Sequence, residues 1–185
     1  MARTESKMLP LGTKAPDFSL PDTVSGRTLK LSDVYGEKAT VVMFICNHCP
    51  YVKHLNKEIS KLAKDYNNEA VGFVAISSND AQKYPEDAPD KMKLNAEEND
   101  FIFPYLYDES QEVAKAYDAA CTPDFYVFDR NLELVYRGQF DDSRPGNSMP
   151  ISGRDIRTAI DAALMGISIY KKQKPSMGCN IKWKE

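Results

Sequence analysis

The sequence has few of the features that a membrane-spanning, secreted or nucleic-acid-binding protein needs. No uncharged run approaches the length of a membrane span, and residues 1–10 carry Arg3, Glu5 and Lys7 without the apolar core of a secretory signal. Positive charge is not in excess, because 24 Lys and Arg stand against 27 Asp and Glu, which gives a net charge of −3. That balance argues against nucleic acid or an anionic membrane as a partner. We expect a cytoplasmic protein with neither kind of partner.

Cysteine is also scarce: four residues in 185 are too few for a disulfide scaffold, and a reducing compartment keeps them as thiols except during turnover. Cys46 and Cys49 form one Cys-x-x-Cys pair. Structural zinc needs four ligands, and neither a second pair nor a His-x-His spacing follows, so we predict no metal. A soft-metal site that joins these two thiols to His48 or His54 stays open as an alternative.

Length and composition fit one soluble globular domain over residues 1–185, with 42% hydrophobic and 28% charged residues. The sequence contains no internal repeat. We interpret residues 1–10 as a loose N-terminus and residues 171–185 as a C-terminal tail.

The apolar run 40–45 is short, uncharged and rich in β-branched and aromatic residues, which predicts a strand buried on both faces. Asn47 is a candidate helix N-cap, and Pro50 fits a first turn, where its missing N–H costs no bond. Apolar residues then recur at the spacing of a helix with one buried face, at Val52, Leu55, Ile59, Leu62, Ala63 and Tyr66. Cys46 and Cys49 are therefore predicted to lie at a helix N-terminus.

A helix N-terminus favours the thiolate, which is the reactive form of cysteine, through its partial positive charge. The spacing lets the second sulfur reach the first, so that Cys49 can resolve a mixed disulfide on Cys46. A protonated His48 would lower the pKa of Cys46 further. The pattern predicts a thiol-disulfide oxidoreductase in which Cys46 is the exposed nucleophile. It uses no cofactor besides a Cys46–Cys49 disulfide, and its partners are a protein or small-molecule disulfide and a thiol reductant.

The remaining patterns predict an α/β fold with a mixed β-sheet and helices on both faces. A second apolar run, 70–77, completes a right-handed βαβ unit with two parallel strands. The other predicted elements are a strand at 103–108, a helix capped by Ser110, an antiparallel hairpin of 124–129 and 132–140, and a last helix opened by Ser152 with Asp155 in a capping box.

Three motifs carry a resemblance to a known family: Ala15-Pro16-Asp17-Phe18, Cys46-Asn47-His48-Cys49 and Thr122-Pro123. Over roughly residues 10–165 the chain resembles thioredoxin-fold proteins of the alkyl hydroperoxide reductase/thiol-specific antioxidant (AhpC/TSA) superfamily, in their branch of thioredoxin-like disulfide reductases. The resemblance implies a thioredoxin-like three-layer fold in which Cys46 attacks and Cys49 resolves. It also implies a cis-Pro123 that faces them, whose loop, with Thr122, offers main-chain groups to an extended substrate. We include Asn47 in this predicted substrate-binding set.

The chain also departs from the patterns of two related groups. Thioredoxins usually carry Trp before the first cysteine and a buried carboxylate six residues earlier, where this chain has Ile45 and Thr40. The usual proton acceptor is therefore missing, and either His48 compensates by favouring the thiolate or a carboxylate from residues 79–100 reaches in. Peroxiredoxins resemble the chain in scaffold but carry Pro-x-x-x-Thr/Ser-x-x-Cys, which neither cysteine of the pair fits. A thiol peroxidase is therefore the alternative function.

Cys121 and Cys179 are candidates for auxiliary redox roles, although each also fits simple burial of a small apolar thiol. Cys121 precedes Thr122-Pro123 directly. In the tail, Cys179, Ile181 and Trp183 alternate with polar residues as on a strand with one buried face. We hypothesise that residues 177–183 dock on the domain with Trp183 buried, and that Cys179 approaches the Cys46/Cys49 pair or Cys121 as a third redox thiol.

Overall fold

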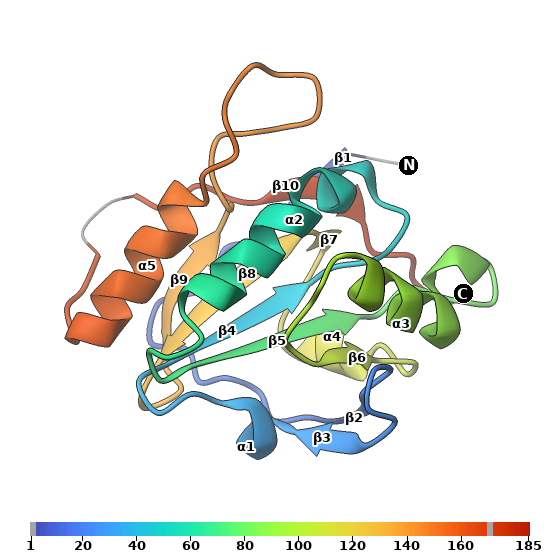
Figure 1. Cartoon of the computed structure of the whole chain (residues 1–185), viewed down its shortest axis with the longest axis horizontal. Coiled ribbons are helices and arrows are strands. Elements are labelled where there is room, and N and C mark those ends of the chain that lie inside the picture. Colours follow the sequence, from blue (N-terminus) through green and yellow to red (C-terminus); the bar gives the residue numbers. More distant parts are fainter. Residues whose placement is uncertain (1–2, 170–171) are drawn as a thin grey trace.

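The computed structural model describes residues 3–169 and 172–185 (Figure 1). Its central sheet has five strands in the order β6-β5-β4-β8-β9, in which β4, β5 and β6 are parallel and β8 and β9 run antiparallel to their neighbours. The strands are β4 (Ala39–Phe44), β5 (Val71–Ser77), β6 (Tyr105–Tyr107), β8 (Asp124–Asp129) and β9 (Leu134–Gly138). The predicted mixed sheet, βαβ unit and hairpin are confirmed. All of β4 is buried, as expected for an uncharged strand with neighbours on both edges.

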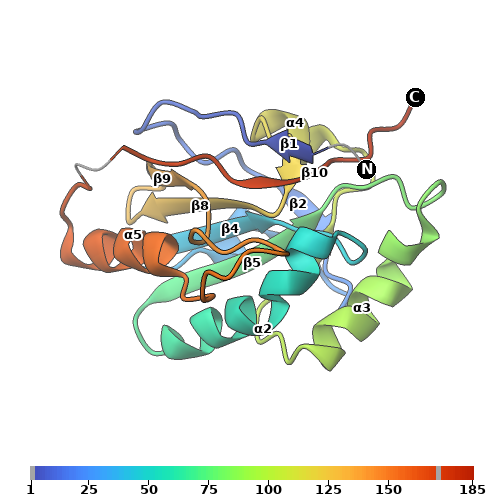
Figure 2. The same ribbon diagram turned by 90° about the horizontal axis from the view of Figure 1, so that it is seen from above.

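Helices cover both faces of this sheet (Figure 2). On one face lie α2 (Pro50–Asp65), α3 (Pro89–Glu98) and α5 (Arg154–Met165), and on the other lie α4 (Glu112–Ala116), α1 (Leu31–Val34) and the hairpin of β2 (Ser19–Pro21) and β3 (Thr28–Lys30). Side chains of β4 alternate between the two cores, with Val41 and Met43 on the α2 side and Val42 and Phe44 on the α4 side. Within the described ranges, no helix is both long enough and apolar enough to cross a membrane.

Three predicted helix caps are wrong. The N-cap of α2 is Cys49 and not Asn47, because Pro50 takes the first helical position. The helices after Ser110 and Ser152 begin one residue later than predicted, with N-caps Gln111 and Gly153, both at positive φ. Each serine hydroxyl instead accepts a hydrogen bond from the backbone N–H two residues on, at 3.3 Å.

The C-terminal segment docks on the domain as β10 (Met177–Asn180), which lies antiparallel between β1 (Arg3–Glu5) and β7 (Cys121–Thr122). Figure 1 shows this second, three-stranded sheet beside the start of α2. The expectation of a loose N-terminus is therefore wrong for residues 3–5, since their backbone pairs with the tail. Residues 1–2 and Lys171, where the predicted tail begins, lie outside the described residues.

Burial in the tail follows the predicted alternation only in part. Cys179 and Ile181 are buried, but Trp183 is 39% exposed, so the prediction of a buried Trp183 is wrong. The strand ends at Asn180, and the strict alternation of a strand no longer holds after it. The end of the chain is instead held by its backbone N–H groups: Ile181 N–H donates to the carbonyl oxygen of Ala120 at 3.1 Å, and Lys184 N–H donates to the side-chain Oε1 of Gln111 at 2.8 Å.

We predict that Ile181→Ala lowers the free energy of unfolding by about 2–5 kcal/mol, because it leaves a cavity under the docked tail. Lys184→Ala, at an exposed neighbouring position, is the matched control and should change it by less than about 0.5 kcal/mol. Denaturant unfolding measures both. Equal stability of the two variants would show that the tail contributes no packing energy through Ile181.

Candidate active site

The two cysteines of the Cys-x-x-Cys pair lie at the junction of β4 and α2. Cys46 follows the end of β4, and Cys49 is the N-cap of α2. All four cysteines are free, and Cys46 and Cys49 are only 1% and 0% exposed. The expectation of an exposed Cys46 is therefore wrong. Its sulfur is covered by the end of β7, because the Cys46 Sγ lies 3.3 Å from the Oγ1 of Thr122.

The loop before β8 closes over both sulfurs. The Thr122–Pro123 peptide bond is cis, as the resemblance implies. The Sγ of Cys49 lies 3.3 Å from the carbonyl oxygen of Thr122. However, Thr122 is paired in the sheet with Cys179 of β10, so its strand edge, which the resemblance assigns to an extended substrate, is occupied by the chain's own tail.

A third sulfur completes the cluster. The Sγ of Cys179 lies 2.7 Å from the Sγ of Cys49, although 130 residues separate the two in sequence. Cys121 is buried as well, but its Sγ turns to the carbonyl oxygen of Pro123, 3.8 Å away, and burial raises its pKa. The structure thus brings Cys179 to the Cys46/Cys49 pair and leaves Cys121 outside it.

The proton is shared unequally between the two cysteines of the pair. The pKa of Cys49 is lowered to about 5, mainly by a hydrogen bond from the Cys46 thiol, with further contributions from the Cys179 thiol and the Val52 N–H. The pKa of Cys46 is raised well above its usual value by the same contact with Cys49, by burial and by the negative charge of Asp87. The expected lowering of the Cys46 pKa is therefore wrong. Cys49 is also the N-cap residue of α2, and the partial positive charge of a helix N-terminus favours its thiolate.

His48 is paired with a buried carboxylate that the sequence did not single out. Its Nδ1 lies 2.5 Å from the Oδ2 of Asp87, whose side chain is 0% exposed. The Nδ2 of Asn79 donates to the same oxygen at 2.7 Å, and the backbone N–H groups of Asn47 and His48 donate to Oδ1 at 2.8 and 3.2 Å. Burial alone raises the pKa of Asp87, but these hydrogen bonds, His48 first, outweigh it and hold the pKa below its usual value.

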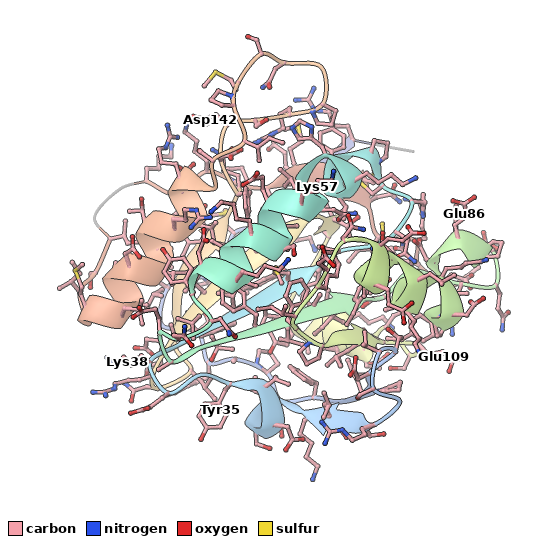
Figure 3. All side chains as sticks on the ribbon, viewed as in Figure 1. Tyr35, Lys38, Lys57, Glu86, Glu109 and Asp142 are labelled. Carbon is pink, nitrogen blue, oxygen red and sulfur yellow. The ribbon has the colours of Figure 1, made fainter. Side chains whose placement is uncertain are left out.

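Asp87 comes from the segment 79–100, from which a carboxylate was one of two expected replacements for the missing proton acceptor. It ends a short 3₁₀ helix, Pro85–Asp87, that follows β5. Its neighbour Glu86 points outward from the edge of the molecule (Figure 3). The side-chain amide of Asn47 donates to Glu86 O at 2.9 Å and accepts from the hydroxyl of Tyr105 at 3.0 Å. Asn47 therefore holds this loop in place and does not cap a helix as predicted.

Three atoms of this site have the spacing of metal ligands. The Cys46 sulfur, a ring nitrogen of His48 and an oxygen of Asp87 lie within 4.8 Å of one another. Ligation by Cys46 would require its thiol to lose its proton when the metal binds. Both oxygens of Asp87 also already accept hydrogen bonds from the protein.

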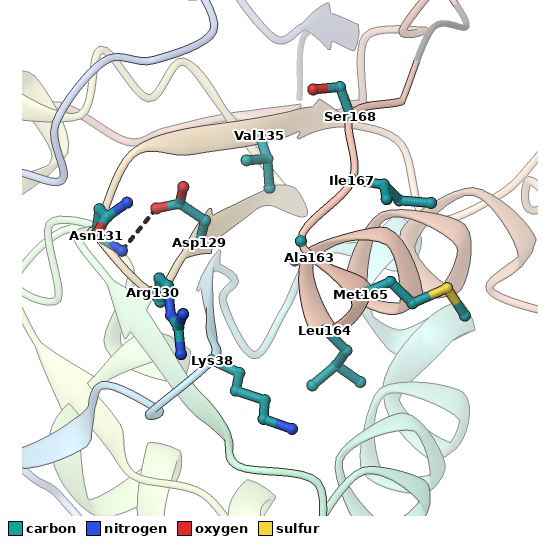
Figure 4. Close-up of a pocket in the computed structure, with 11 residues that line it drawn as sticks. Lys38, Asp129, Arg130, Asn131, Val135, Ala163, Leu164, Met165, Ile167 and Ser168 are labelled. Atoms are coloured by element: carbon teal, nitrogen blue, oxygen red, sulfur yellow. Dashed lines mark hydrogen bonds between the residues drawn. The ribbon is translucent and has the colours of Figure 1, made fainter.

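A separate cavity of about 400 Å³ lies between the β8–β9 turn and the end of α5 (Figure 4). Lys38, Asp129 and Arg130 contribute its charged side chains. None of the four cysteines lines it, so it is distinct from the thiol site.

Comparison with known proteins gives one family and several relatives. The model of the AhpC/TSA family matches residues 11–137. The thiol-disulfide oxidoreductase ResA of Geobacillus kaustophilus is 27% identical over 131 residues, which cover 71% of this chain and 70% of that protein. The crystal structure of an uncharacterized conserved protein from Geobacillus kaustophilus is 60% identical, with a TM-score of 0.97 over 100% of this chain and 97% of that one.

A more distant structure bears on the fold alone. The thioredoxin domain of a thiol-disulfide oxidoreductase from Bacteroides vulgatus is 16% identical, with a TM-score of 0.65 over 85% of this chain and 99% of that one. The predicted thioredoxin-like fold is thereby confirmed.

We predict that the reduced protein gains a thiolate as the pH rises through about 5, because the folded state lowers the pKa of Cys49 to that value. Ultraviolet thiolate absorbance against pH measures it. Cys46→Ala should move the midpoint upward, since the largest stabilising hydrogen bond is lost, and Cys179→Ala should move it upward by less. Cys121→Ser is the matched control and should leave the midpoint unchanged. A wild-type midpoint near the ordinary thiol value of about 8.5 would contradict the assignment.

Proposed function

The chain belongs to the AhpC/TSA family, and from this premise we propose that it is a thiol-disulfide oxidoreductase that exchanges its Cys46/Cys49 dithiol with a protein or small-molecule disulfide. The observation that carries the proposal is the thiolate of Cys49 held against the Cys46 thiol under the cis-Pro123 loop. A dithiol that shares one proton at neutral pH is ready for disulfide exchange. The similarity to ResA, a thiol-disulfide oxidoreductase by name, supports the class of reaction.

Cys46 is the attacking residue in this proposal. The sulfur of Cys49 lies against Cys179 and Thr122 O, whereas among the described residues the sulfur of Cys46 has a polar contact only with Thr122 Oγ1 besides its partner cysteine. In the first step, the Cys46 sulfur attacks one sulfur of the substrate disulfide. The substrate S–S bond breaks and its other half leaves as a thiolate.

His48 and Asp87 take the proton that Cys46 gives up. With Asp87 ionised, His48 donates through Nδ1 and its Nε2 is left free to accept, and this buried atom has no partner among the described residues. The Cys46 sulfur lies within 4.8 Å of one ring nitrogen of His48 and of an oxygen of Asp87. The carboxylate holds the tautomer and stabilises the imidazolium that forms. The pair thus takes the place of the proton acceptor that thioredoxins keep at the position of Thr40.

In the second step, the Cys49 thiolate attacks the Cys46 sulfur of the mixed disulfide. The Cys46–Cys49 bond forms, the bond to the substrate breaks, and the second substrate half leaves and takes the proton from His48. The protein dithiol has then lost two electrons and the substrate disulfide has gained them. A thiol reductant returns the protein to its dithiol form, and no further cofactor takes part.

We predict that reduced Cys49→Ser accumulates a mixed disulfide with a disulfide-containing protein, because the residue that would release it is absent. Cys46→Ser should form none and should lose disulfide reductase activity. Non-reducing gels with and without added dithiol, together with turnover of the disulfide, measure both. The matched control is Cys121→Ser, whose sulfur lies outside the cluster and which should behave like wild type. Full reductase activity in Cys46→Ser would refute the proposed role of Cys46.

A second prediction tests the His48–Asp87 pair. Asp87→Asn should slow disulfide reduction at neutral pH by about 10²-fold, because His48 loses the carboxylate that fixes its tautomer and orientation. A purely electrostatic role predicts the opposite sign, since the charge of Asp87 raises the pKa of Cys46 and its removal would favour the thiolate. The rate of the variant should recover as the pH rises and Cys46 ionises unaided. Asp90→Asn, at an exposed carboxylate in the first turn of α3, is the control.

A further inference from the structure

Strand pairing of the backbone fixes the position of Cys179. β10 pairs with β7 in the register that sets Cys179 opposite Thr122, the residue whose carbonyl oxygen contacts the Sγ of Cys49. Gly178 permits this approach, because a Cβ there would overlap the carbonyl oxygen of Thr122. On its other side β10 is held by β1. Pairing of β10 on both edges therefore holds the Cys179 sulfur at a defined position.

That place is beside Cys49, which stands between two thiols. Cys46 and Cys179 each give a hydrogen bond that lowers the pKa of Cys49. If position 179 served only to fill space in the core, any small residue would suffice there. A sulfur at 2.7 Å from the sulfur of Cys49 adds a group that can exchange with a disulfide at Cys49.

We propose that Cys179 is a second resolving thiol, which attacks Cys49 once the Cys46–Cys49 disulfide has formed and so moves the disulfide to Cys49–Cys179. The proposal rests on the proposed oxidoreductase function and deepens it. The Cys179 sulfur loses its proton and bonds to the Cys49 sulfur, the Cys46–Cys49 bond breaks, and its electron pair leaves on Cys46, which takes up a proton. No electron enters or leaves the protein, so the step needs no further reactant.

The charges around Cys179 favour this order of events. In the reduced protein, burial and the adjacent Cys49 thiolate raise the pKa of Cys179 to about 12, which keeps it protonated. When Cys49 enters a disulfide its charge disappears, and only burial is left to oppose ionisation. The nearby positive charge of Lys182 lowers the pKa of Cys179. Cys179 thus becomes a better nucleophile after the first disulfide has formed, and the rearranged protein carries a reduced Cys46.

The test is a disulfide map of Cys46→Ser treated with the thiol oxidant diamide. Trypsin cuts after Lys38, Lys53, Lys172 and Lys182, so Cys49 lies in peptide 39–53 and Cys179 in peptide 173–182. We expect mass spectrometry to find these two peptides joined, and reduction to separate them. The link should persist in Cys46→Ser/Cys121→Ser and vanish in Cys46→Ser/Cys179→Ser. Absence of the 39–53 to 173–182 link in folded protein, or a link through Cys121 instead, would overturn the proposal.

A second measurement follows the rearrangement in the wild-type protein. After oxidation by a disulfide substrate, free thiols are alkylated and the peptides are mapped. We expect a fraction of molecules with Cys46 alkylated and Cys49 joined to Cys179, and exclusive Cys46–Cys49 pairing would refute the rearrangement. The diamide map requires no turnover, so its outcome is independent of the reductase assays. If the Cys49–Cys179 link forms but the protein has no reductase activity, only the proposed function is refuted. If the protein is an active reductase but the link does not form, only the proposed role of Cys179 is refuted.

Discussion

A buried negative charge on Cys49 is the interaction on which the rest of the site depends. A thiolate removed from water is costly unless donors replace the lost hydration. Here the donors are two thiols and two backbone amides, from Cys46, Cys179 and Val52. They come from the loop after β4, from β10 and from the first turn of α2, which only the completed fold brings together. The Cys49 thiolate is therefore stabilised by the strand order, by the position of Pro50 and by the docking of the tail.

A second buried anion decides where the remaining proton lies. Asp87 is satisfied by its hydrogen bonds with His48, with Asn79 and with two backbone amides, so it stays ionised despite full burial. Its charge raises the pKa of Cys46, as does the thiolate of Cys49. Cys46 therefore rests as a thiol between two negative groups, and in the proposed mechanism it becomes nucleophilic when a neighbouring group accepts its proton. The same carboxylate that holds back ionisation also supports the histidine that can receive that proton.

Much of this was predictable from local sequence patterns, and the missing parts were set by contacts distant in sequence. Strand periodicity and the Cys-x-x-Cys spacing placed the thiol pair at a strand–helix junction, because both signals are local. Asp87 escaped prediction because the segment 79–100 holds several carboxylates that local sequence does not distinguish. β1 escaped because the three residues Arg3–Glu5 have no apolar pattern and pair with a strand at the other end of the chain. The error at Asn47 was avoidable, since Pro50 already favoured a helix start at that residue.

The docked strand β10 affects both the access of a substrate to the edge of β7 and the pKa of Cys49. An extended peptide that bound by pairing with β7 at Thr122 would have to displace β10, which occupies that edge. Displacement would carry Cys179 away and remove both its thiol and its backbone N–H from Cys49, two of the groups that lower the Cys49 pKa. A substrate that reached Cys46 without displacing β10 would instead encounter Cys49 with its pKa still lowered by Cys179. Under the proposed oxidoreductase function, the docked strand would favour disulfides that are presented without an adjacent strand partner, through the same contacts that stabilise the thiolate.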